Sequence, residues 1–311
     1  MTKAAVAASY GGPEVIEIVE RELPEPAKGE VVVEVKAIGV NPFDFKSYSG
    51  AFGTDESKLP IPLGSEASGI VVAVGGTVEG PVGPIAVGDE VIVSGVNGTY
   101  TEKILAPARF VFPKPANLDW DVAAGVLAVA GTAYDALESV GVKSGDTVLV
   151  HGAAGGVGSV VAQLAKERGA TVIGTARARN HEALRAFGAE PVEYGDGLLG
   201  RVRAVAPKGI DAAIDAVGTD EAVDVSLELL TDRSKLVTIA AQGRAQADGF
   251  LTVGGPASME RRRLASPTLL EQAGAGVFEV TVAKTFPLDD VARAHTELQS
   301  THPRGKFILI P

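Results

Sequence analysis

A glycine-rich stretch at residues 148–158, VLVHGAAGGVG, constrains the fold more than any other part of the sequence. It reads as an apolar run, then a turn, then the start of a helix, and Gly152, Gly155 and Gly158 recur at intervals of three. In the frame G-x-G-x-x-G the first position is Ala153. Such a turn brings the backbone close to a pyrophosphate, and the helix N-terminus offers free N–H groups to the phosphates. The stretch therefore predicts a dinucleotide-binding site.

The residues around and after this turn alternate between apolar strands and helical patterns. Nearly continuous apolar strands separated by helices are typical of a parallel sheet that is covered on both faces. We expect strands at residues 147–150, 170–174, 191–194, 210–215 and 235–239, and helices at 157–168, 180–187, 198–205 and 220–230.

The first 115 residues have a different pattern, in which short β-branched runs lie between glycine and proline turns. This spacing predicts a compact, mostly antiparallel β domain. The tail of the chain then adds a strand, a helix and a final strand. The expected strands are 30–40, 68–74, 89–93 and 100–105, and the tail elements are 278–284, 287–299 and 306–310.

The end of the second strand of the alternating region indicates which nicotinamide cofactor is bound. NADH sites place an acidic residue there to bind the ribose 2′-hydroxyl, but residues 168–181 contain no Asp or Glu. A 2′-phosphate needs small residues for room and cations for pairing, which Thr175, Arg177 and Arg179 supply. The sequence therefore predicts NADPH as the cofactor.

Composition excludes several other classes of function. The net charge is −11 and the pI is about 5.0, which disfavours sequence-independent binding to nucleic acid or to an anionic membrane. The absence of cysteine excludes disulfides, iron–sulfur clusters and cysteine nucleophiles. The first residues lack a signal-peptide pattern, and the most apolar window, 122–134, is shorter than a membrane span. We expect a cytoplasmic protein with a small-molecule substrate.

Motifs along essentially the whole chain resemble the zinc-free quinone oxidoreductase branch of the medium-chain dehydrogenase/reductase superfamily, to which enone and alkenal reductases also belong. The matching segments are AIGVNPFD at 37–44, PLGSEASGIVVAVG at 62–75, GDEV at 88–91, GTAYDAL at 131–137, HGAAGGVG at 151–158, DAVG at 215–218, TFPL at 285–288 and RGK at 304–306. The resemblance implies an α/β protein, with a GroES-like β domain at residues 1–118 and 277–311 and a doubly wound Rossmann NADPH-binding domain at 119–276.

The resemblance also implies which residues form the site. Asn41, Lys46 and Tyr48 are the expected catalytic residues, on the segment that follows the strand ending near residue 40. The expected cofactor contacts, which include the turn and the cation pair deduced above, are Asp44, Thr132, Gly152, Ala153, Ala154, Gly155, Gly156, Val157, Gly158, Thr175, Arg177, Arg179, Val217, Ala240, Ala241, Arg304 and Lys306.

No metal is expected in this chain. Zinc-dependent relatives place a cysteine ligand where Asn41 stands and a histidine ligand where Ser65 stands. The four histidines, His151, His181, His295 and His302, lie in separate elements; we expect His151 to support the phosphate turn and the others to be structural or exposed. Without a Lewis acid, hydride transfer to an acceptor that is already electrophilic is the easier chemistry.

The acceptor class is narrowed by one departure from bacterial quinone reductases. Several of those proteins carry tyrosines five and eleven residues after the matching asparagine, where this chain has Lys46 and Phe52. The pattern Asn41-Pro-x-Asp44-x-Lys46 is similar to plant-type enone and alkenal reductases. It favours α,β-unsaturated carbonyl compounds over quinones as the substrate.

Two alternatives remain open on the sequence alone. One is an enoyl-thioester reductase, which would need a basic patch for an acidic carrier; Arg261, Arg262 and Arg263 form the one basic triplet, which we expect to be a solvated helix face. The other is a non-enzymatic NADPH-binding protein, since a fold alone does not fix a function. The family resemblance further suggests a homodimer that pairs through a strand at residues 250–253.

Overall fold

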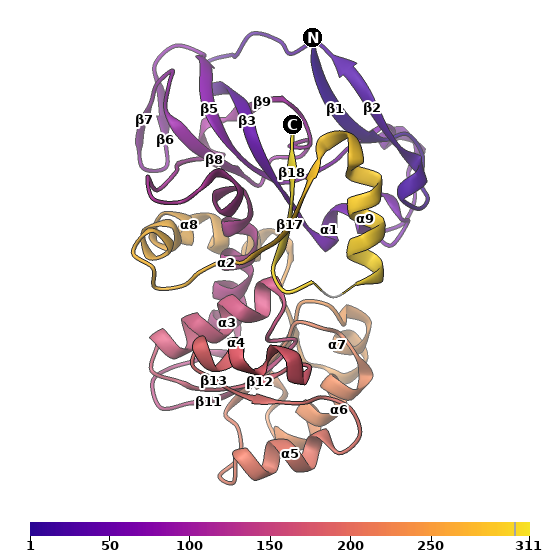
Figure 1. Cartoon of the computed structure of the whole chain (residues 1–311), viewed down its shortest axis with the longest axis vertical. Helices are drawn as coiled ribbons and strands as arrows, with labels where there is room; N and C mark the ends of the chain where they lie inside the picture. The colour runs from indigo at the N-terminus through magenta and orange to yellow at the C-terminus, as the bar shows by residue number, and fades with distance from the viewer. Residues whose placement is uncertain (302) are drawn as a thin grey trace. The chain divides into compact units, whose positions relative to one another are not determined.

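The computed structural model describes residues 1–301 and 303–311, so His302 lies outside the described residues. The chain forms two compact units (Figure 1). Unit 1 comprises Met1–Ala128, Ser266–Gly274 and Val280–Pro311, and unit 2 comprises Val129–Ala265 and Ala275–Glu279. The division differs from the expected boundaries at residues 118 and 277 because it falls inside helices α2 (Trp120–Val140) and α8 (Gly255–Gly274), each of which contributes to both units.

Unit 1 is built on a seven-stranded sheet, whose strands follow the order β10-β8-β5-β3-β18-β17 with β9 also paired to β3. All pairs are antiparallel except β17 with β18. The strands are β3 (Glu30–Val40), β5 (Glu66–Val74), β8 (Glu90–Ser94), β9 (Lys103–Pro107), β10 (Val111–Pro113), β17 (Val282–Pro287) and β18 (Lys306–Ile310).

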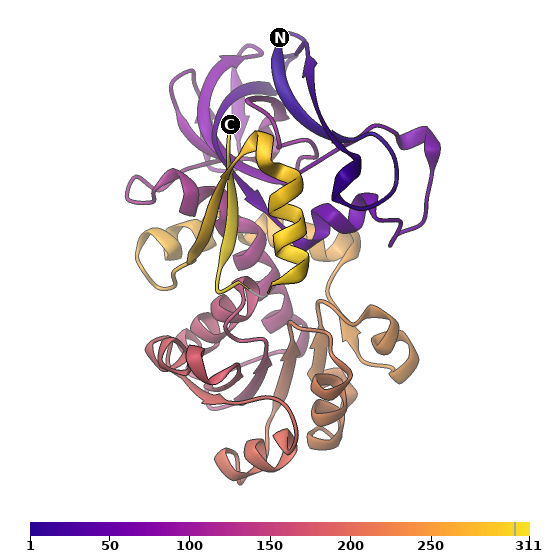
Figure 2. The ribbon, with the colours of Figure 1, turned by 45° about the vertical axis from the view of Figure 1, so that its right-hand side comes forward.

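Smaller elements complete unit 1. A three-stranded sheet has the order β2-β1-β4, and β6 pairs with β7 in a separate hairpin. Helix α9 packs against β17, β18 and α1 (Figure 2). The bounds are β1 (Thr2–Ala7), β2 (Ile16–Arg21), β4 (Ile61–Pro62), β6 (Val78–Gly80), β7 (Gly83–Ile85), α1 (Pro42–Tyr48) and α9 (Val291–Ser300).

The tail of the chain belongs to the core of unit 1. Strand β18 pairs with β3 so that Phe307 lies opposite Val40. Phe286 of β17 and Tyr48 of α1 are among the largest side chains that are fully buried in this core. The GroES-like fold that the resemblance implied is therefore confirmed for this unit, including the return of the C-terminal segment.

Unit 2 contains a six-stranded parallel sheet in the order β13-β12-β11-β14-β15-β16, with helices packed against it (Figure 1). Leu149, Ile173, Ala213 and Leu236 come from four of these strands and share one hydrophobic core. The strands are β11 (Thr147–His151), β12 (Thr171–Thr175), β13 (Ala189–Val192), β14 (Ala212–Asp215), β15 (Leu236–Thr238) and β16 (Leu251–Thr252). The helices include α3 (Gly156–Glu167), α4 (His181–Ala186), α5 (Leu198–Val205), α6 (Asp220–Leu229) and α7 (Gln242–Asp248).

Three elements begin at least three residues later than the sequence predicted. The strand expected at 100–105 starts at Lys103, because the preceding backbone at Tyr100 bonds to Ala5 and Leu63 instead. The strand expected at 278–284 starts at Val282, because the peptide groups of Glu279 bond to the Gln163 side chain. The helix expected from residue 287 opens with a 3-10 turn, Leu288–Asp290, before α9.

Among the described residues, every helix is too short or too polar to cross a lipid bilayer.

Candidate functional site

The glycine turn of unit 2 has the geometry that a pyrophosphate requires. It joins β11 to α3, and Gly152 adopts a positive φ of 71°, a conformation that favours glycine. A Cβ on Gly158 would collide with the backbone carbonyl of Gly152, so this glycine lets the helix approach the strand closely. A Cβ on Gly155 would meet only the Gly152 carbonyl oxygen, at 3.3 Å, which leaves its other side open to a ligand.

The N-terminus of α3 supplies donors at this turn. Gly155 is the N-cap, so the N–H groups of Gly156, Val157 and Gly158 belong to the first helical turn and have no partner within the helix. They also lie at the positive end of the helix dipole, where an anion is stabilised. The residues present therefore fit the diphosphate of a dinucleotide.

A buried chain of polar side chains supports the turn from below. The Gly152 N–H donates to Thr175 Oγ1 over 3.3 Å, and that hydroxyl lies 3.4 Å from His151 Nδ1. His151 Nε2 lies 3.1 Å from Ser226 Oγ, which itself donates to the Ala222 carbonyl. Burial lowers the pKa of His151 to about 4, so the imidazole is neutral at pH 7. Thr175 thus supports the turn, and its predicted place at the 2′-phosphate stays a prediction.

The buried side chain of Asp215 fixes the loops after β14 and β15. Asp215 Oδ1 accepts from the N–H groups of Val217 and Gly218 at 3.0 and 2.8 Å. Its Oδ2 accepts from Thr238 Oγ1, which in turn accepts from the N–H groups of Ala240 and Ala241 at 3.0 and 2.9 Å. These bonds hold the predicted cofactor contacts Val217, Ala240 and Ala241 at the carboxyl ends of the parallel strands, where ligands of such sheets bind.

The predicted cation pair lies on the surface beyond β12. Arg177 and Arg179 are both exposed, and Arg177 Nε donates to Tyr194 Oη over 2.6 Å. Tyr194 is 43% exposed and was missed by the sequence reasoning. The signal for it was present, because β13 runs parallel to β12 with Val192 opposite Thr175, so the residues just after both strands are neighbours. Two guanidinium groups and a phenol there suit a phosphate monoester.

Three further residues were predicted to contact the cofactor, two in unit 2 and one, Arg304, in unit 1. The Ala153 side chain is buried, and its N–H donates to the Thr175 carbonyl over 3.1 Å, whereas Gly152, Ala154, Gly155, Gly156 and Val157 are partly exposed. Thr132 is half-buried on α2 and Arg304 is exposed beside β18; both remain predictions.

In unit 1, Asn41 lies within a cluster of polar side chains. It is the N-cap of α1, and its Nδ2 donates to Glu66 Oε1 over 3.0 Å. Lys306 Nζ donates to Asn41 Oδ1 over 2.6 Å, to the Val40 carbonyl over 2.9 Å and to Glu66 Oε1 over 2.9 Å. Lys306 was predicted to bind the cofactor; instead its ammonium is buried and its three donors all serve unit 1.

A second network of hydrogen bonds in unit 1 contains Asp44 and Tyr48. Tyr48 Oη lies 2.7 Å from His295 Nδ1, and His295 Nε2 lies 3.0 Å from Tyr100 Oη. Tyr100 donates to Asp44 Oδ2 over 2.8 Å, and the Asn41 N–H donates to the same oxygen over 2.8 Å. All four side chains are buried. The structure thus places Tyr48 and Asp44 in a buried network, and their predicted roles at the substrate and the cofactor stay predictions.

Burial controls protonation in this network. It raises the pKa of Asp44 to about 6, against lowering contributions from the two hydrogen bonds, and it lowers the pKa of His295 to about 4. Burial also raises the pKa of Tyr100 well above its ordinary value. A neutral His295 fits the geometry, because one ring nitrogen must accept from Tyr48 while the other donates to Tyr100. Lys46, on the same helix, is half-buried.

The basic triplet on α8 is not a simple solvated face. Asp135 of α2 is fully buried, and its Oδ1 accepts from Arg261 Nε over 2.7 Å. Its Oδ2 accepts from Arg262 Nε over 3.2 Å and from the Ser258 hydroxyl. Only Arg263 pairs along its own helix, with Glu260. The expectation of a solvated triplet was therefore wrong, because a carboxylate far away in sequence needs two of these cations.

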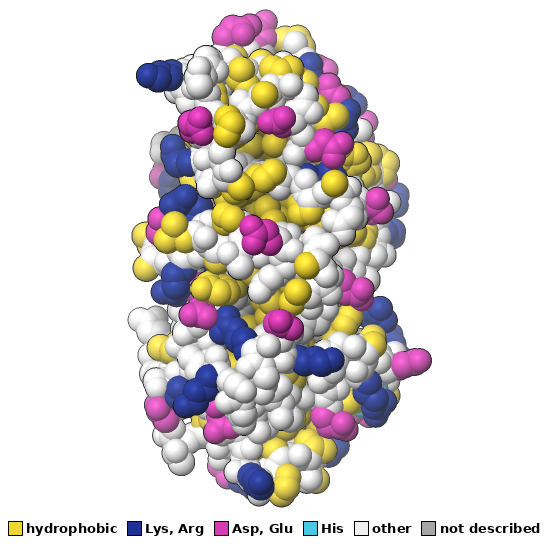
Figure 3. Space-filling view, turned by 90° about the vertical axis from the view of Figure 1, so that its left-hand side faces the viewer, with side chains coloured by type: hydrophobic (Ala, Val, Ile, Leu, Met, Phe, Trp, Pro, Cys, Tyr) yellow, Lys and Arg dark blue, Asp and Glu magenta, His cyan; other side chains and the backbone are white. Residues whose placement is uncertain are grey.

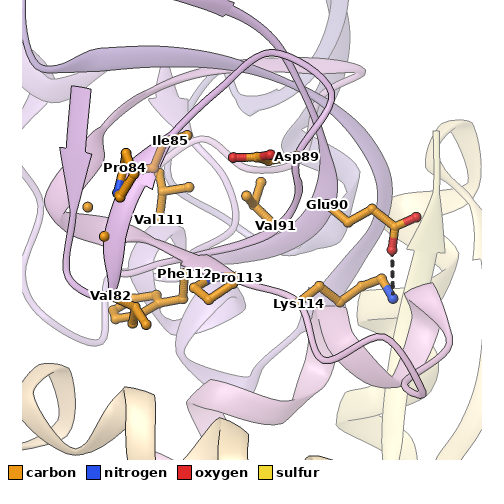
Figure 4. Close-up of a pocket in the computed structure, with 12 residues that line it drawn as sticks. Val82, Pro84, Ile85, Asp89, Glu90, Val91, Val111, Phe112, Pro113 and Lys114 are labelled. Atoms are coloured by element: carbon orange, nitrogen blue, oxygen red, sulfur yellow. Dashed lines mark ion pairs between the residues drawn. The ribbon is translucent and has the colours of Figure 1, made fainter. Parts of the chain in front are cut away.

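One cavity of about 380 Å³ in unit 1 contains none of the predicted site residues. It lies between the β6–β7 hairpin, β8 and β10, with Val82, Ile85 and Phe112 on its walls (Figure 4). Lys114 closes one end and forms an ion pair of 3.0 Å with Glu90 (Figure 4).

Known proteins match both units. Residues 27–116 match the family described as the alcohol dehydrogenase GroES-like domain, and residues 156–269 match the family described as zinc-binding dehydrogenase. Human quinone oxidoreductase is 30% identical, over 97% of this chain and 95% of its own. Quinone oxidoreductase of Pseudomonas aeruginosa is 33% identical over the full length of both chains. The chain belongs to the quinone oxidoreductase family of medium-chain dehydrogenases and reductases.

Solved structures of this family agree. The Escherichia coli quinone oxidoreductase complexed with NADPH has a TM-score of 0.86 and 30% identity, covering all of both chains. A mycobacterial protein complexed with NADPH has a TM-score of 0.86 and 32% identity, covering 99% of this chain and 100% of its own.

The residues present do not fit the zinc ion that the name of the second matching family implies. Asn41 and Ser65 replace the cysteine and histidine ligands of zinc-dependent relatives, and a buried ammonium, that of Lys306, bonds to the Asn41 amide oxygen. Within the described part of the chain, no three His, Cys, Asp or Glu side chains come together as a metal site. Neutral amide and hydroxyl oxygens beside an ammonium are a poor donor set for zinc.

Proposed function

We propose that this chain is an NADPH-dependent oxidoreductase that transfers a hydride to a quinone or to the β-carbon of an α,β-unsaturated carbonyl compound. The observation that carries the proposal is the combination in unit 2 of a phosphate turn at the N-terminus of α3 with Arg177 and Tyr194 beyond the next strand. Relatives named quinone oxidoreductase and two similar structures solved with NADPH support it. They also favour quinones ahead of the enones that Lys46 suggested.

Each group of residues has a distinct task in this proposal. The N–H groups of residues 156–158 hold the pyrophosphate, while Arg177, Arg179 and Tyr194 hold the 2′-phosphate. Bound NADPH supplies a hydride from C4 of its nicotinamide ring. Asn41 and Lys46 of unit 1 donate hydrogen bonds toward the acceptor oxygen or the nicotinamide riboside, and the reduced acceptor takes its proton from water.

Cofactor selectivity tests the proposal most directly. A charge-assisted hydrogen bond contributes about 1.5–3 kcal/mol, or roughly 10- to 150-fold in affinity. We expect Arg177→Ala combined with Arg179→Ala to weaken NADPH binding by at least this factor and to leave the NADH affinity unchanged, measured by fluorescence titration. Tyr194→Phe should have a smaller effect in the same direction.

Arg203 provides the matched control. It is an exposed arginine of unit 2 that pairs with Glu228, so Arg203→Ala should bind both cofactors as the unchanged protein does. Equal affinity of the unchanged protein for NADPH and NADH would contradict the assignment of the cation pair.

An assay of NADPH oxidation by the unchanged protein, with quinones, enones and acyl thioesters as acceptors, distinguishes the alternatives. A thioester reductase needs a basic surface for an acidic carrier, but Arg261 and Arg262 are bonded to Asp135. On the face drawn in Figure 3, cationic and anionic side chains are interspersed rather than gathered. Turnover of thioesters alone would favour that alternative, and absence of all turnover would favour a non-enzymatic NADPH-binding protein.

We also propose a cytoplasmic homodimer. Strand β16 lies at the edge of the six-stranded sheet of unit 2, where its unpaired backbone groups can pair with a second copy. Light scattering after size-exclusion chromatography should give twice the chain mass of 31.8 kDa. Thr252→Pro, which removes an edge N–H donor, should shift the mass toward the monomer.

A further inference from the structure

Asn41, Glu66 and Lys306 form a closed hydrogen-bonded triangle in unit 1. They come from three neighbouring strands of the large sheet: Asn41 follows β3, Glu66 begins β5 and Lys306 begins β18. Glu66 is 0% exposed and Lys306 is 4% exposed, while Asn41 reaches partly to the surface. The two charges are thus enclosed and the amide is the one member of the triangle that a ligand can touch.

Charge alone determines which way the Asn41 amide points. An ammonium can only donate, so the atom 2.6 Å from Lys306 Nζ must be the amide oxygen. A carboxylate can only accept, so the atom 3.0 Å from Glu66 Oε1 must be the amide nitrogen. An amide flipped by 180° would place oxygen against carboxylate and nitrogen against ammonium. Both contacts would be repulsive, and neither charge can be solvated instead.

The partners of the triangle are themselves fixed. Glu66 Oε2 accepts from the Ala128 N–H over 2.9 Å, and the third donor of Lys306 bonds to the Val40 carbonyl. There is no room for Glu66 to move toward β3, because a Cβ on Gly39 would already collide with its carboxylate. The orientation of the Asn41 amide is therefore set by a rigid frame.

We infer that Glu66 and Lys306 are positioning residues that hold the Asn41 amide so that its second N–H, and not its oxygen, is presented to the acceptor. The inference rests on the proposed function. A donor fixed in advance stabilises the negative charge that develops on a carbonyl or quinone oxygen as the hydride arrives, and loss of one such donor typically lowers kcat by about 10²–10³. If the Asn41 amide could rotate, its oxygen would face the acceptor oxygen for part of the time, and the two would repel each other.

A charge-neutral pair of substitutions separates this positioning role of Glu66 and Lys306 from a purely structural role. Glu66→Gln combined with Lys306→Met keeps both shapes and leaves no lone buried charge, so the fold is retained. We expect kcat to fall by about 10², with the NADPH dissociation constant unchanged, because the phosphate sites of unit 2 are untouched. Unfolding of unit 1, followed by Trp120 fluorescence, shows that the variant is folded in the assay.

Asn41→Ala supplies the decisive comparison. If the frame acts through Asn41, then adding Asn41→Ala to the charge-neutral pair should cause little further loss, since the two changes remove the same interaction. If the kcat losses of Asn41→Ala and of the charge-neutral pair multiply in the combined variant, the inference is wrong. It is also wrong if the charge-neutral pair has an unaltered kcat. The control is Glu90→Gln with Lys114→Met, which neutralises another pair in unit 1 whose lysine is buried (Figure 4) and should leave kcat unchanged.

A second readout does not depend on turnover. In nitrogen-15-labelled protein, the two side-chain amide protons of Asn41 are assigned by their loss in Asn41→Ala. One of them should exchange slowly with solvent because it is bonded to the buried Glu66 carboxylate, and the other should exchange faster. Both should exchange fast in the charge-neutral pair. Equal rates in the unchanged protein would overturn the inference, whereas failure to reduce any quinone or enone would overturn only the proposed function.

Discussion

Asp44 gives the sharpest test of the buried network around α1, because its ionisation is opposed by burial. Its pKa is about 6 in the folded protein, against an ordinary value of 3.8. Between these two values the folded state keeps a proton that the unfolded state has released. The folded protein therefore loses stability through Asp44 as the pH rises from about 4 to about 6, and this loss is complete at pH 7.

The size of the effect follows from the same pKa difference. Linkage gives about 1.4 kcal/mol for each pH unit between the folded and unfolded pKa values. Over the roughly two pH units involved, Asp44 destabilises unit 1 by ~3 kcal/mol at pH 7 relative to pH 4. Asn at this position cannot ionise. The stability of Asp44→Asn minus that of the unchanged protein should therefore rise by ~3 kcal/mol between pH 4 and pH 7.

The assay uses the single tryptophan, Trp120, which belongs to unit 1 and so reports its unfolding in urea. Taking the difference between two proteins cancels the titrating groups outside this network, such as His151. The control is Asp55→Asn, an exposed carboxyl of unit 1 whose pKa is lowered by hydrogen bonds to Ser57, so its stability difference must change in the opposite direction. A difference for Asp44→Asn that is flat or falling with pH would refute the burial argument.

Three further outcomes are expected. The pKa of His295 is lowered to about 4 by burial, so the stability of His295→Gln relative to the unchanged protein should fall by ~3 kcal/mol as the pH rises from 4 to 6.5 in the same urea assay. Gly158→Val should abolish NADPH binding in a titration, because its side chain would collide with the backbone of the turn, whereas Gly200→Ala, at an open helical position, should bind normally. Asp135→Ala should destabilise unit 2 by about 1.5–3 kcal/mol in thermal unfolding, because it removes the buried carboxylate that accepts from Arg261 and Arg262, and unfolding at the normal temperature would contradict that role.

The elements that sequence predicts well are those whose signal is local. The turn at residues 152–158 and the strands β11 and β18 match their expected positions because apolar periodicity and glycine spacing reflect the backbone of the same few residues. Arg177 and Arg179 lie just after β12, as expected, for the same reason, since they directly follow an apolar strand, and their contact with the cofactor stays a prediction. Tyr194 needed one more step, the register between β12 and β13.

The residues whose surroundings the sequence did not reveal have partners far away in the chain. Whether Tyr48 faces solvent is decided by His295, 247 residues later, which covers that side of α1. Arg261 reads as a surface cation until Asp135, 126 residues earlier, is found buried beside it. Lys306 follows an exposed arginine and a glycine, a context typical of a surface turn. A single sequence contains no signal for such pairings, because they follow from packing between elements rather than from the periodicity of either one.

The two buried networks of unit 1 meet at Asn41 and hold different parts of it. The Glu66–Lys306 pair bonds to the side-chain amide, while Asp44 accepts from the backbone N–H of the same residue. The first network consists of opposite charges that neutralise each other, and the second of a carboxyl near its titration point joined to neutral phenol and imidazole groups. Neutralising the first frees the amide to turn without moving the helix. Protonation of Asp44 weakens the hydrogen bond that it accepts from the Asn41 N–H at the N-terminus of α1. A loss of activity at low pH that persists in the charge-neutral pair would therefore be caused by the second network.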